Sequence, residues 1–311
     1  MEPSITPEHI KWAYRLFLDR EPENELLLHR SVPNTQTLRR QFLDSSEYQM
    51  KNAASALSID KWVIVATKLG FRILVALNEF GVSRPILLDE YEPEAVALFK
   101  SLVKPGDRVI DVGANIGFHS LFFAQLVGPT GRVLSFEPVK YLYDALIASV
   151  AENHFHDRIE AYNCAISDRA GTSLIRHAVG TSNFGGAHLA DVKRDDGHAY
   201  DEIETKTLSD FISDQRCNLI KIDAEGAEGR VLQGAVDLLK RDRALLFVEL
   251  FNEQLTKISG LTATALIKWM AMFAYRCLET TGGKPGRELA AYDAPEIMNV
   301  LFVPDTGARD V

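Results

Sequence analysis

Residues 109–120 read Val-Ile-Asp-Val-Gly-Ala-Asn-Ile-Gly-Phe-His-Ser, and this stretch decides the fold. An apolar run of strand character passes into a glycine turn and then into a helical pattern. Gly113 and Gly117 permit a tight turn, and free amides at the helix start can bind a carboxylate or phosphate. The plain alternative is a strand-to-helix turn without a ligand. The glycines stand four apart with Asp111 before them, which departs from the G-x-G-x-x-G pattern of nicotinamide-binding loops and disfavours a dehydrogenase.

Short apolar runs around this stretch alternate with amphipathic, helix-like runs from residue 93 onward. Each apolar run has the length of a buried strand and ends at a polar residue. This alternation is typical of a mainly parallel sheet with helices on both faces, in which ligands bind at the carboxyl ends of the strands. We therefore predict an α/β fold with its site residues at the strand ends. The predicted strands are 108–111, 132–137, 159–163, 219–223 and 245–249.

Residues 1–58 have a different pattern and predict a small helical module. Thr6 can cap a helix that has Pro7 at its first position, and apolar residues follow at helical spacing as far as Leu18. Trp12 is expected to anchor the core of this module. No catalytic cluster accompanies these helices.

Residues 59–311 form the second predicted domain. It opens with a hairpin around Gly70 and closes with a helix at 262–274 followed by two strands. Residues 172–207 are rich in glycine and too long for an ordinary loop, so we predict an inserted hairpin or lid there.

Composition excludes several classes of protein. The 311 residues include 34 basic and 43 acidic side chains, a net charge of −9, which disfavours a nucleic-acid partner. An apolar content of 46% is that of a soluble globular protein. Cys164, Cys217 and Cys277 form no C-x-x-C pair, so neither a disulfide framework nor a zinc site is predicted. No apolar run approaches the ~18 residues of a membrane span, and we expect a cytoplasmic protein.

S-adenosylmethionine is a ligand that suits the glycine loop. It presents a carboxylate to the amides, an ammonium group to a nearby acid and ribose hydroxyls to a second acid. Glu137 ends the next strand and is placed to bind the ribose hydroxyls. Ala165, near the end of the third strand, is small enough for an adenine ring to lie flat against the backbone. Each signal is weak alone, but their order and spacing support one another.

Four stretches of the chain resemble the FkbM-type S-adenosylmethionine-dependent methyltransferases. The most specific is 219–228, which contains the string Asp-x-Glu-Gly-x-Glu, and the others are 109–120, 135–138 and 163–168. The resemblance covers about residues 85–250. It implies a class I methyltransferase fold, which is a Rossmann-like, seven-stranded, mostly parallel sheet, here preceded by the all-α module. It also implies O-methylation of sugar or polyketide-type hydroxyls as the usual chemistry.

The resemblance further implies roles for individual residues. Ser120 would reach the methionine carboxylate, and Tyr91 and Glu92 would cover the amino-acid end of the cofactor. His119 stands where the family commonly has an aromatic residue, so a packing role is expected. The cofactor-binding residues implied are Asp111, Gly113, Ala114, Asn115, Gly117, Ser120, Glu137, Ala165 and Glu92.

By the same resemblance, Asp223 and Glu225 would face the methyl group and the acceptor. A carboxylate that removes the proton of an alcohol as the new bond forms contributes roughly 10²–10⁴-fold to the rate. We expect one of this pair to be that base or to orient the acceptor. Two adjacent acids repel, which raises one pKa and suits a base. The pair would equally bind a divalent metal with Glu249 or with an imidazole from the lid, although no metal is predicted.

Plainer explanations exist for some of these residues. Glu225 and Glu228 could be first-turn acids that complement a helix dipole. His188 could be a solvent-exposed loop histidine, but it follows a flexible glycine segment suited to closing over a substrate. We therefore group His188 with Tyr91 and Glu249 as residues that face the substrate.

The leading prediction is an O-methyltransferase that acts on a hydroxyl of a sugar, glycan precursor or related small molecule. Within residues 1–58, the stretches 14–22 and 42–48 resemble a small helical module found beside bacterial glycan enzymes. This module would dock a protein partner, an extended acceptor or a second copy of the chain. A nucleic-acid methyltransferase is disfavoured by the charge and by the string Asp-Ala-Glu-Gly, where adenine-amino methyltransferases usually carry Asn/Asp-Pro-Pro-Tyr/Phe. The non-enzymatic alternative is a catalytically silent scaffold for glycan enzymes.

Overall fold

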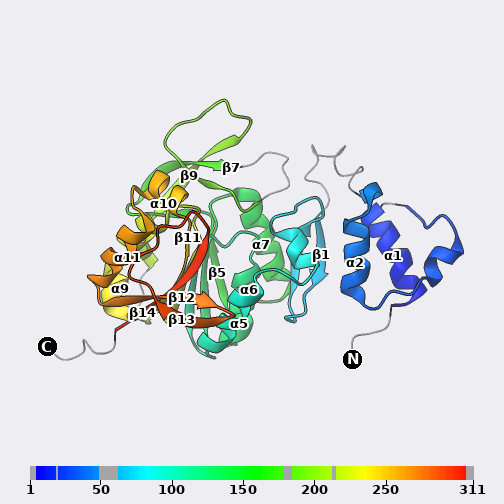
Figure 1. The fold of residues 1–311 in the computed structure, drawn as a ribbon, viewed down its shortest axis with the longest axis horizontal. Coiled ribbons are helices and arrows are strands. Elements are labelled where there is room, and N and C mark those ends of the chain that lie inside the picture. Colours follow the sequence, from blue (N-terminus) through cyan, green and yellow to red (C-terminus); the bar gives the residue numbers. More distant parts are fainter. Residues whose placement is uncertain (1–4, 19, 49–61, 178–183, 212–214, 306–311) are drawn as a thin grey trace.

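The computed structural model describes residues 5–18, 20–48, 62–177, 184–211 and 215–305. Figure 1 shows a small group of helices beside a larger domain, in which helices cover a central sheet. The predicted boundary at residue 58 lies outside the described residues. In the part of the chain that the structure describes, no helix combines the length and apolar character needed to cross a membrane.

The N-terminal helices are α1 (Pro7–Leu18), η1 (Glu25–His29) and α2 (Thr35–Leu43). The predicted helical stripe of α1 is buried, and the rings of Tyr14 and Phe42 pack edge to face with centroids 4.9 Å apart. Asn34 caps α2 by accepting a hydrogen bond from the amide of Thr37 at 2.8 Å. The prediction for Trp12 is wrong, because its side chain lies off the buried stripe and is 57% exposed.

The central sheet is mostly parallel and has the strand order β13-β12-β14-β11-β10-β3-β4-β5. The five strands from β11 to β5 are parallel, whereas β14 runs antiparallel to both of its neighbours. Seven of the strands form the predicted class I methyltransferase sheet, and β13 adds an eighth as a hairpin with β12. The strands are β3 (Arg108–Val112), β4 (Arg132–Phe136), β5 (Ile159–Tyr162), β10 (Leu219–Ile222), β11 (Leu245–Leu250), β12 (Tyr275–Thr281), β13 (Lys284–Glu288) and β14 (Met298–Pro304).

Both faces of this sheet are buried, as the apolar strand runs predict. Neighbouring residues of β3 belong to different core clusters, since Val109 packs in one and Ile110 in the other. The first cluster includes α5 (Pro93–Leu102), α6 (Phe118–Val127) and α7 (Lys140–Glu152). The second includes α8 (Glu228–Gln233), α9 (Val236–Asp242), α10 (Asn252–Ser259) and α11 (Ala263–Ala271).

Two smaller sheets flank this core. The predicted hairpin pairs β1 (Trp62–Ala66) with β2 (Arg72–Ala76), and it leads into the short helix α4 (Ser83–Leu87). The predicted insertion is a four-stranded sheet rather than a simple hairpin, and it begins earlier than residue 172. Its order is β6-β9-β7-β8, formed by β6 (Ala165–Ile166), β7 (Gly171–His177), β8 (His188–Ala190) and β9 (Ala199–Lys206), with η2 (Leu208–Phe211) after it.

Candidate active site

A cavity of about 420 Å³ lies at the carboxyl ends of β3, β4, β10 and β11. This is the point where the order of the parallel strands reverses, between β3 and β10, and ligands of open α/β sheets bind there. The sheet of the insertion closes one side, and the segment before α5 closes another. The predicted site residues that line the cavity are Tyr91, Glu92, Gly113, Ala114, Asn115, Glu137, Ala165, His188, Asp223, Glu225 and Glu249.

Gly113 brings the glycine loop into contact with the end of β10. Its φ is +79°, a conformation that side chains disfavour, and a Cβ there would lie 1.8 Å from the carbonyl oxygen of Asp223. Gly117 has a φ of +93°, and a Cβ there would lie 2.4 Å from a methyl carbon of Leu146. The two glycines are therefore required by close packing, which holds the loop and the Asp223 strand end together.

The amides of loop residues 113–117 are all hydrogen-bonded within the protein, which leaves the expectation of free amides to the start of α6. The β4 strand end supplies acceptors for three of them, and the loop itself supplies the rest. A ligand carboxylate must therefore be bound by other groups. The amides of Gly113 and Ala114 donate to Phe136 O (both 3.0 Å), that of Asn115 to Glu137 Oε2 (2.8 Å), that of Ile116 to Asn115 Oδ1 (2.8 Å) and that of Gly117 to Ala114 O (2.9 Å).

Asp111 and Ser120, which are predicted to bind the cofactor, belong to a buried hydrogen-bonded network at the start of α6. Both side chains are fully buried, and neither they nor Gly117 line the cavity. The Ser120 hydroxyl donates to Asp111 Oδ2 at 2.6 Å and accepts from the hydroxyl of Ser135 at 2.8 Å. With its hydroxyl occupied in this way, Ser120 ties β3, α6 and β4 together.

Glu137 presents the ribose-binding chemistry that the sequence predicts. It is 4% exposed, and its two oxygens accept the amides of Asn115 and Val139 at 2.8 Å each. Burial raises the pKa of Glu137 to about 7, although these amides oppose the shift. Each carboxylate oxygen has a second lone pair, which can accept a hydrogen bond from a hydroxyl group in the cavity.

Lys221 is a cavity residue that the sequence reasoning missed. Its side chain is 3% exposed, and its Nζ lies 3.2 Å from Asp223 Oδ2 and 3.5 Å from Asp111 Oδ1. Burial would lower the pKa of Lys221, but the charges of Asp223 and Asp111 outweigh it and the pKa is raised. A lysine inside the apolar run of β10 was the available signal, because a buried charge requires partners.

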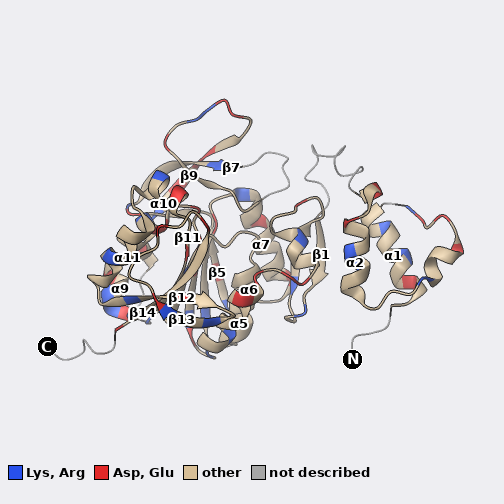
Figure 2. Ribbon diagram, viewed as in Figure 1, with Lys and Arg blue, Asp and Glu red and all other residues tan. Residues whose placement is uncertain are grey.

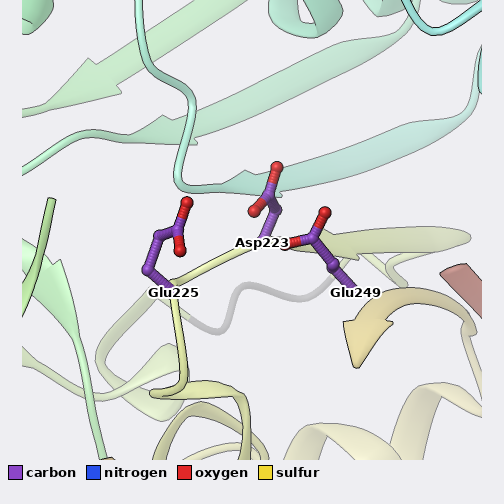
Figure 3. A group of neighbouring side chains, drawn as sticks. All are labelled: Asp223, Glu225 and Glu249. Carbon is purple, nitrogen blue, oxygen red and sulfur yellow. The ribbon is translucent and has the colours of Figure 1, made fainter. Parts of the chain in front are cut away.

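Three carboxylates converge on the cavity from the β10–α8 loop and β11, as Figure 3 shows. Asp223, Glu225 and Glu249 each place an oxygen within 4.8 Å of the others. Burial, followed by the charges of Asp223 and Glu228, raises the pKa of Glu225 to about 8. The charge of Asp223, followed by burial, raises the pKa of Glu249 to about 9. Glu225 and Glu249 therefore hold protons at neutral pH, and Asp223 is paired with Lys221.

The same three oxygens have the chemistry to share a divalent cation, because Mg²⁺ and Ca²⁺ prefer carboxylate ligands. Among the described residues this is the group with suitable spacing, and it includes no imidazole. Of the two alternatives left open for a third ligand, Glu249 belongs to this group.

His188 and Glu228 are both buried, so neither is a simple surface residue. His188 is 7% exposed on β8 and lines the cavity, with Nδ1 3.1 Å from Gly186 O, and burial lowers its pKa. Glu228 accepts the amides of Ala224 and Gly226 at 2.9 and 3.1 Å. Glu228 therefore stabilises the loop that carries Glu225, in agreement with a structural role, whereas Glu225 itself lines the cavity.

Tyr91 and Glu92 form the cavity wall next to the carboxylates. Glu92 Oε2 lies 2.9 Å from His119 Nε2, and this pairing lowers the pKa of Glu92 to about 2 although burial opposes it. Burial raises the pKa of Tyr91, whose ring packs on Phe118 at 4.9 Å. His119 packs among aromatic rings such as Phe99, as expected, and in addition holds Glu92 in place.

The raised pKa of Glu249 predicts a pH-dependent loss of stability. The folded state retains the proton up to about pH 9, whereas the unfolded chain releases it near 4.5, so the free energy of unfolding falls as pH rises between these values. Glu249→Gln should therefore be more stable than the wild type at pH 8.5 by roughly 1–3 kcal/mol and about equal at pH 5. Urea unfolding at both values measures this, and an equal difference at both would refute the assignment.

Comparison with known proteins agrees with this geometry. The family model described as "Methyltransferase FkbM domain" matches residues 111–277. The 31-O-demethyl-FK506 methyltransferase FkbM of Streptomyces tacrolimicus is 32% identical over 163 residues, which are 43% of this chain and 62% of that protein. Methyltransferase sdnD of Sordaria araneosa is 30% identical over 155 residues, or 40% of this chain and 59% of that protein. The matched regions thus span about six-tenths of the length of these curated relatives.

A solved structure of methyltransferase FkbM from Methylobacillus flagellatus KT covers 71% of this chain and 54% of its own. It is 16% identical, with a TM-score of 0.40. The matched family model covers more than half of the chain, including the glycine loop and the converging carboxylates. The chain therefore belongs to the FkbM family of S-adenosylmethionine-dependent methyltransferases.

Proposed function

We propose that this protein uses S-adenosylmethionine to methylate a hydroxyl of a sugar, glycan precursor or related small molecule. One observation carries the proposal. The contact of Gly113 with the Asp223 carbonyl puts the glycine loop and the three carboxylates in one cavity, so a cofactor on the loop and an acceptor at the carboxylates would meet.

The cavity residues fit this cofactor. Glu137 offers acceptors for ribose hydroxyls, and Ala165 leaves room for a flat ring. The first-turn amides of α6 have no side-chain cap, because Gly117 precedes them, and they can face a ligand carboxylate. A volume of about 420 Å³ lies in the usual range of small-molecule sites, ~300–1,000 Å³. When bound, the cofactor supplies an electrophilic methyl carbon.

The carboxylates supply the proton chemistry of an acceptor hydroxyl. Glu225 has the pKa best matched to a general base near neutral pH, because a base with a pKa close to the working pH combines availability with proton affinity. Asp223 Oδ2 accepts a hydrogen bond from Lys221 at 3.2 Å, which fixes the carboxyl group so that it can orient the acceptor hydroxyl by accepting its hydrogen bond. Glu249, protonated at neutral pH, can donate to a second acceptor oxygen.

The charge of the cavity supports an uncharged acceptor. Lys221, the lysine that lines the cavity, is already paired with Asp223 and Asp111, so it offers a phosphate group no free positive charge. Basic and acidic residues are also interspersed along the elements in Figure 2. Both features disfavour a nucleic-acid acceptor. The carboxylates that line the cavity are Glu90, Glu92, Glu137, Asp223, Glu225 and Glu249.

Two further proposals concern the N-terminal helices and the location of the protein in the cell. The N-terminal helices would contact a partner protein, an extended acceptor or a second copy of the chain. A cytoplasmic location is supported by the three cysteines, which are all buried and unpaired.

Calorimetric titration with S-adenosylmethionine and, separately, with NAD tests the cofactor. We expect micromolar binding of S-adenosylmethionine and none of NAD. Glu137→Gln should weaken binding about 10-fold, because it weakens charge-assisted hydrogen bonds worth roughly 1.5–3 kcal/mol. Glu160→Gln is the matched control, since Glu160 is an exposed carboxylate on the neighbouring strand β5. Binding of NAD alone, or of neither ligand, would refute the proposal, and a screen of neutral sugars for methyl transfer would then lose its basis.

A further inference from the structure

The turn at residues 87–92, between α4 and α5, is held from outside by helix α2 of the N-terminal module. Gln36 Nε2 donates to the main-chain carbonyl of Leu88 at 2.7 Å, and an Arg39 guanidinium nitrogen donates to that of Leu87 at 2.7 Å. The same Arg39 nitrogen lies 3.5 Å from Asp89 Oδ2, in a pair whose side chains are 19% and 11% exposed. These contacts are specific for the path of the turn, because two of them reach its backbone.

The inner side of the same turn is the cavity wall. Glu90, Tyr91 and Glu92 all line the cavity, and the Glu92–His119 pair fixes the wall from within. Asp89 and Glu92 have φ values of +56° and +41°, a region that non-glycine residues enter only when surrounding contacts hold them there. The backbone of the turn is therefore in an unfavourable conformation, which contacts with the surrounding elements must stabilise.

Side chains of α2 also contact Glu90, further along the turn. Arg40 forms an ion pair with Glu90, and Gln36 Nε2 lies 3.2 Å from Glu90 Oε1. Glu90 therefore contacts the module while it also lines the cavity. The side chain of Asp89 meanwhile accepts the amide of Lys68, from the β1–β2 hairpin, at 3.1 Å.

We propose that the N-terminal helical module supports the active site from outside. Gln36 and Arg39 are positioning residues that hold the Tyr91–Glu92 wall in its binding conformation. This rests on the proposed function, because the wall is assigned to the cofactor and acceptor. The module acts through the 87–92 turn and touches no ligand itself. Without these two donors, the strained turn relaxes and the wall leaves its place beside Asp223.

The test compares the full chain with the double variant Gln36→Ala, Arg39→Ala. We expect the Kd for S-adenosylmethionine to rise about 5- to 20-fold, and amide hydrogen exchange at residues 88–92 to accelerate in the ligand-free protein. Arg39→Lys keeps a donor for the Leu87 carbonyl. With Gln36 left unchanged, this single variant should therefore keep most of the wild-type affinity that the double variant loses. Arg15→Ala is the matched control, since Arg15 pairs with Glu21 inside the module. It should leave both readouts within about 2-fold.

Calorimetry separates positioning from simple unfolding. A loss of folded protein lowers the binding stoichiometry and leaves the Kd of the remaining protein unchanged, whereas displacement of the wall raises the Kd at full stoichiometry. An unchanged Kd in the double variant, with unchanged exchange at 88–92, would overturn the inference. If the wild type does not bind S-adenosylmethionine, the proposed function fails, but the exchange measurement still decides whether the module holds the turn.

Discussion

Gly113→Ala is expected to weaken S-adenosylmethionine binding by roughly 30-fold to 10⁴-fold. The new methyl carbon would lie 1.8 Å from the carbonyl oxygen of Asp223, and the residue would keep a φ of +79°. Overpacking costs roughly 1–3 kcal/mol, and a side chain in a disfavoured backbone region costs roughly 1–3 kcal/mol more. Only separation of the glycine loop from the β10 strand end relieves the contact, so the cavity loses the alignment of its two halves.

Gly128→Ala is the control for backbone strain alone. Gly128 has a φ of +65° at the end of α6, and a Cβ there would meet nothing within 4 Å. Calorimetric Kd values and urea unfolding of both variants make the comparison. Equal Kd values for the two variants would show that the contact with Asp223 does not hold the cavity together.

Much of the fold could be predicted because local patterns determine it. The apolar runs that became β3, β4, β10 and β11 are short and bounded by polar residues, and their alternation with helices determines a parallel sheet. By contrast, β13 is exposed along its whole length and contains Pro285 and Gly286, so it has no apolar pattern to detect. The strands β6 and β8 have two and three residues, and only their pairing with neighbouring strands defines them.

Residues of the candidate site could be predicted where the type of side chain restricts the surroundings it can have. A carboxylate at a strand end must face a cavity or a partner, and Glu137 and Glu225 do so. The role of Ser120 could not be read in this way, because a hydroxyl serves a ligand or a buried network equally well. The pairing of the loop amides could not be predicted for a similar reason. Three of the five acceptors come from Phe136 and Glu137, at the end of the next strand, which the local sequence of the loop does not contain.

Glu225→Gln is expected to reduce kcat by roughly 10²–10⁴-fold, the contribution of a general base, with little change in the Kd of S-adenosylmethionine. Glutamine keeps the shape of the side chain but cannot take a proton from the acceptor hydroxyl. Glu253→Gln is the matched control, because Glu253 is exposed on α10 and does not line the cavity. Methyl transfer to an active acceptor, measured with saturating cofactor, gives kcat for each variant.

The pH dependence of kcat identifies the base more sharply than the loss of rate does. A base acts when deprotonated, so wild-type kcat should rise with pH through about 8, the pKa to which burial and Asp223 raise Glu225, and should not level off near 4.5. Asp223→Asn removes the negative charge that helps to raise this pKa, and the rising limb should therefore move to lower pH, whatever the residual rate. A limb that stays in place in Asp223→Asn, or that persists in Glu225→Gln, would mean that another group takes the proton.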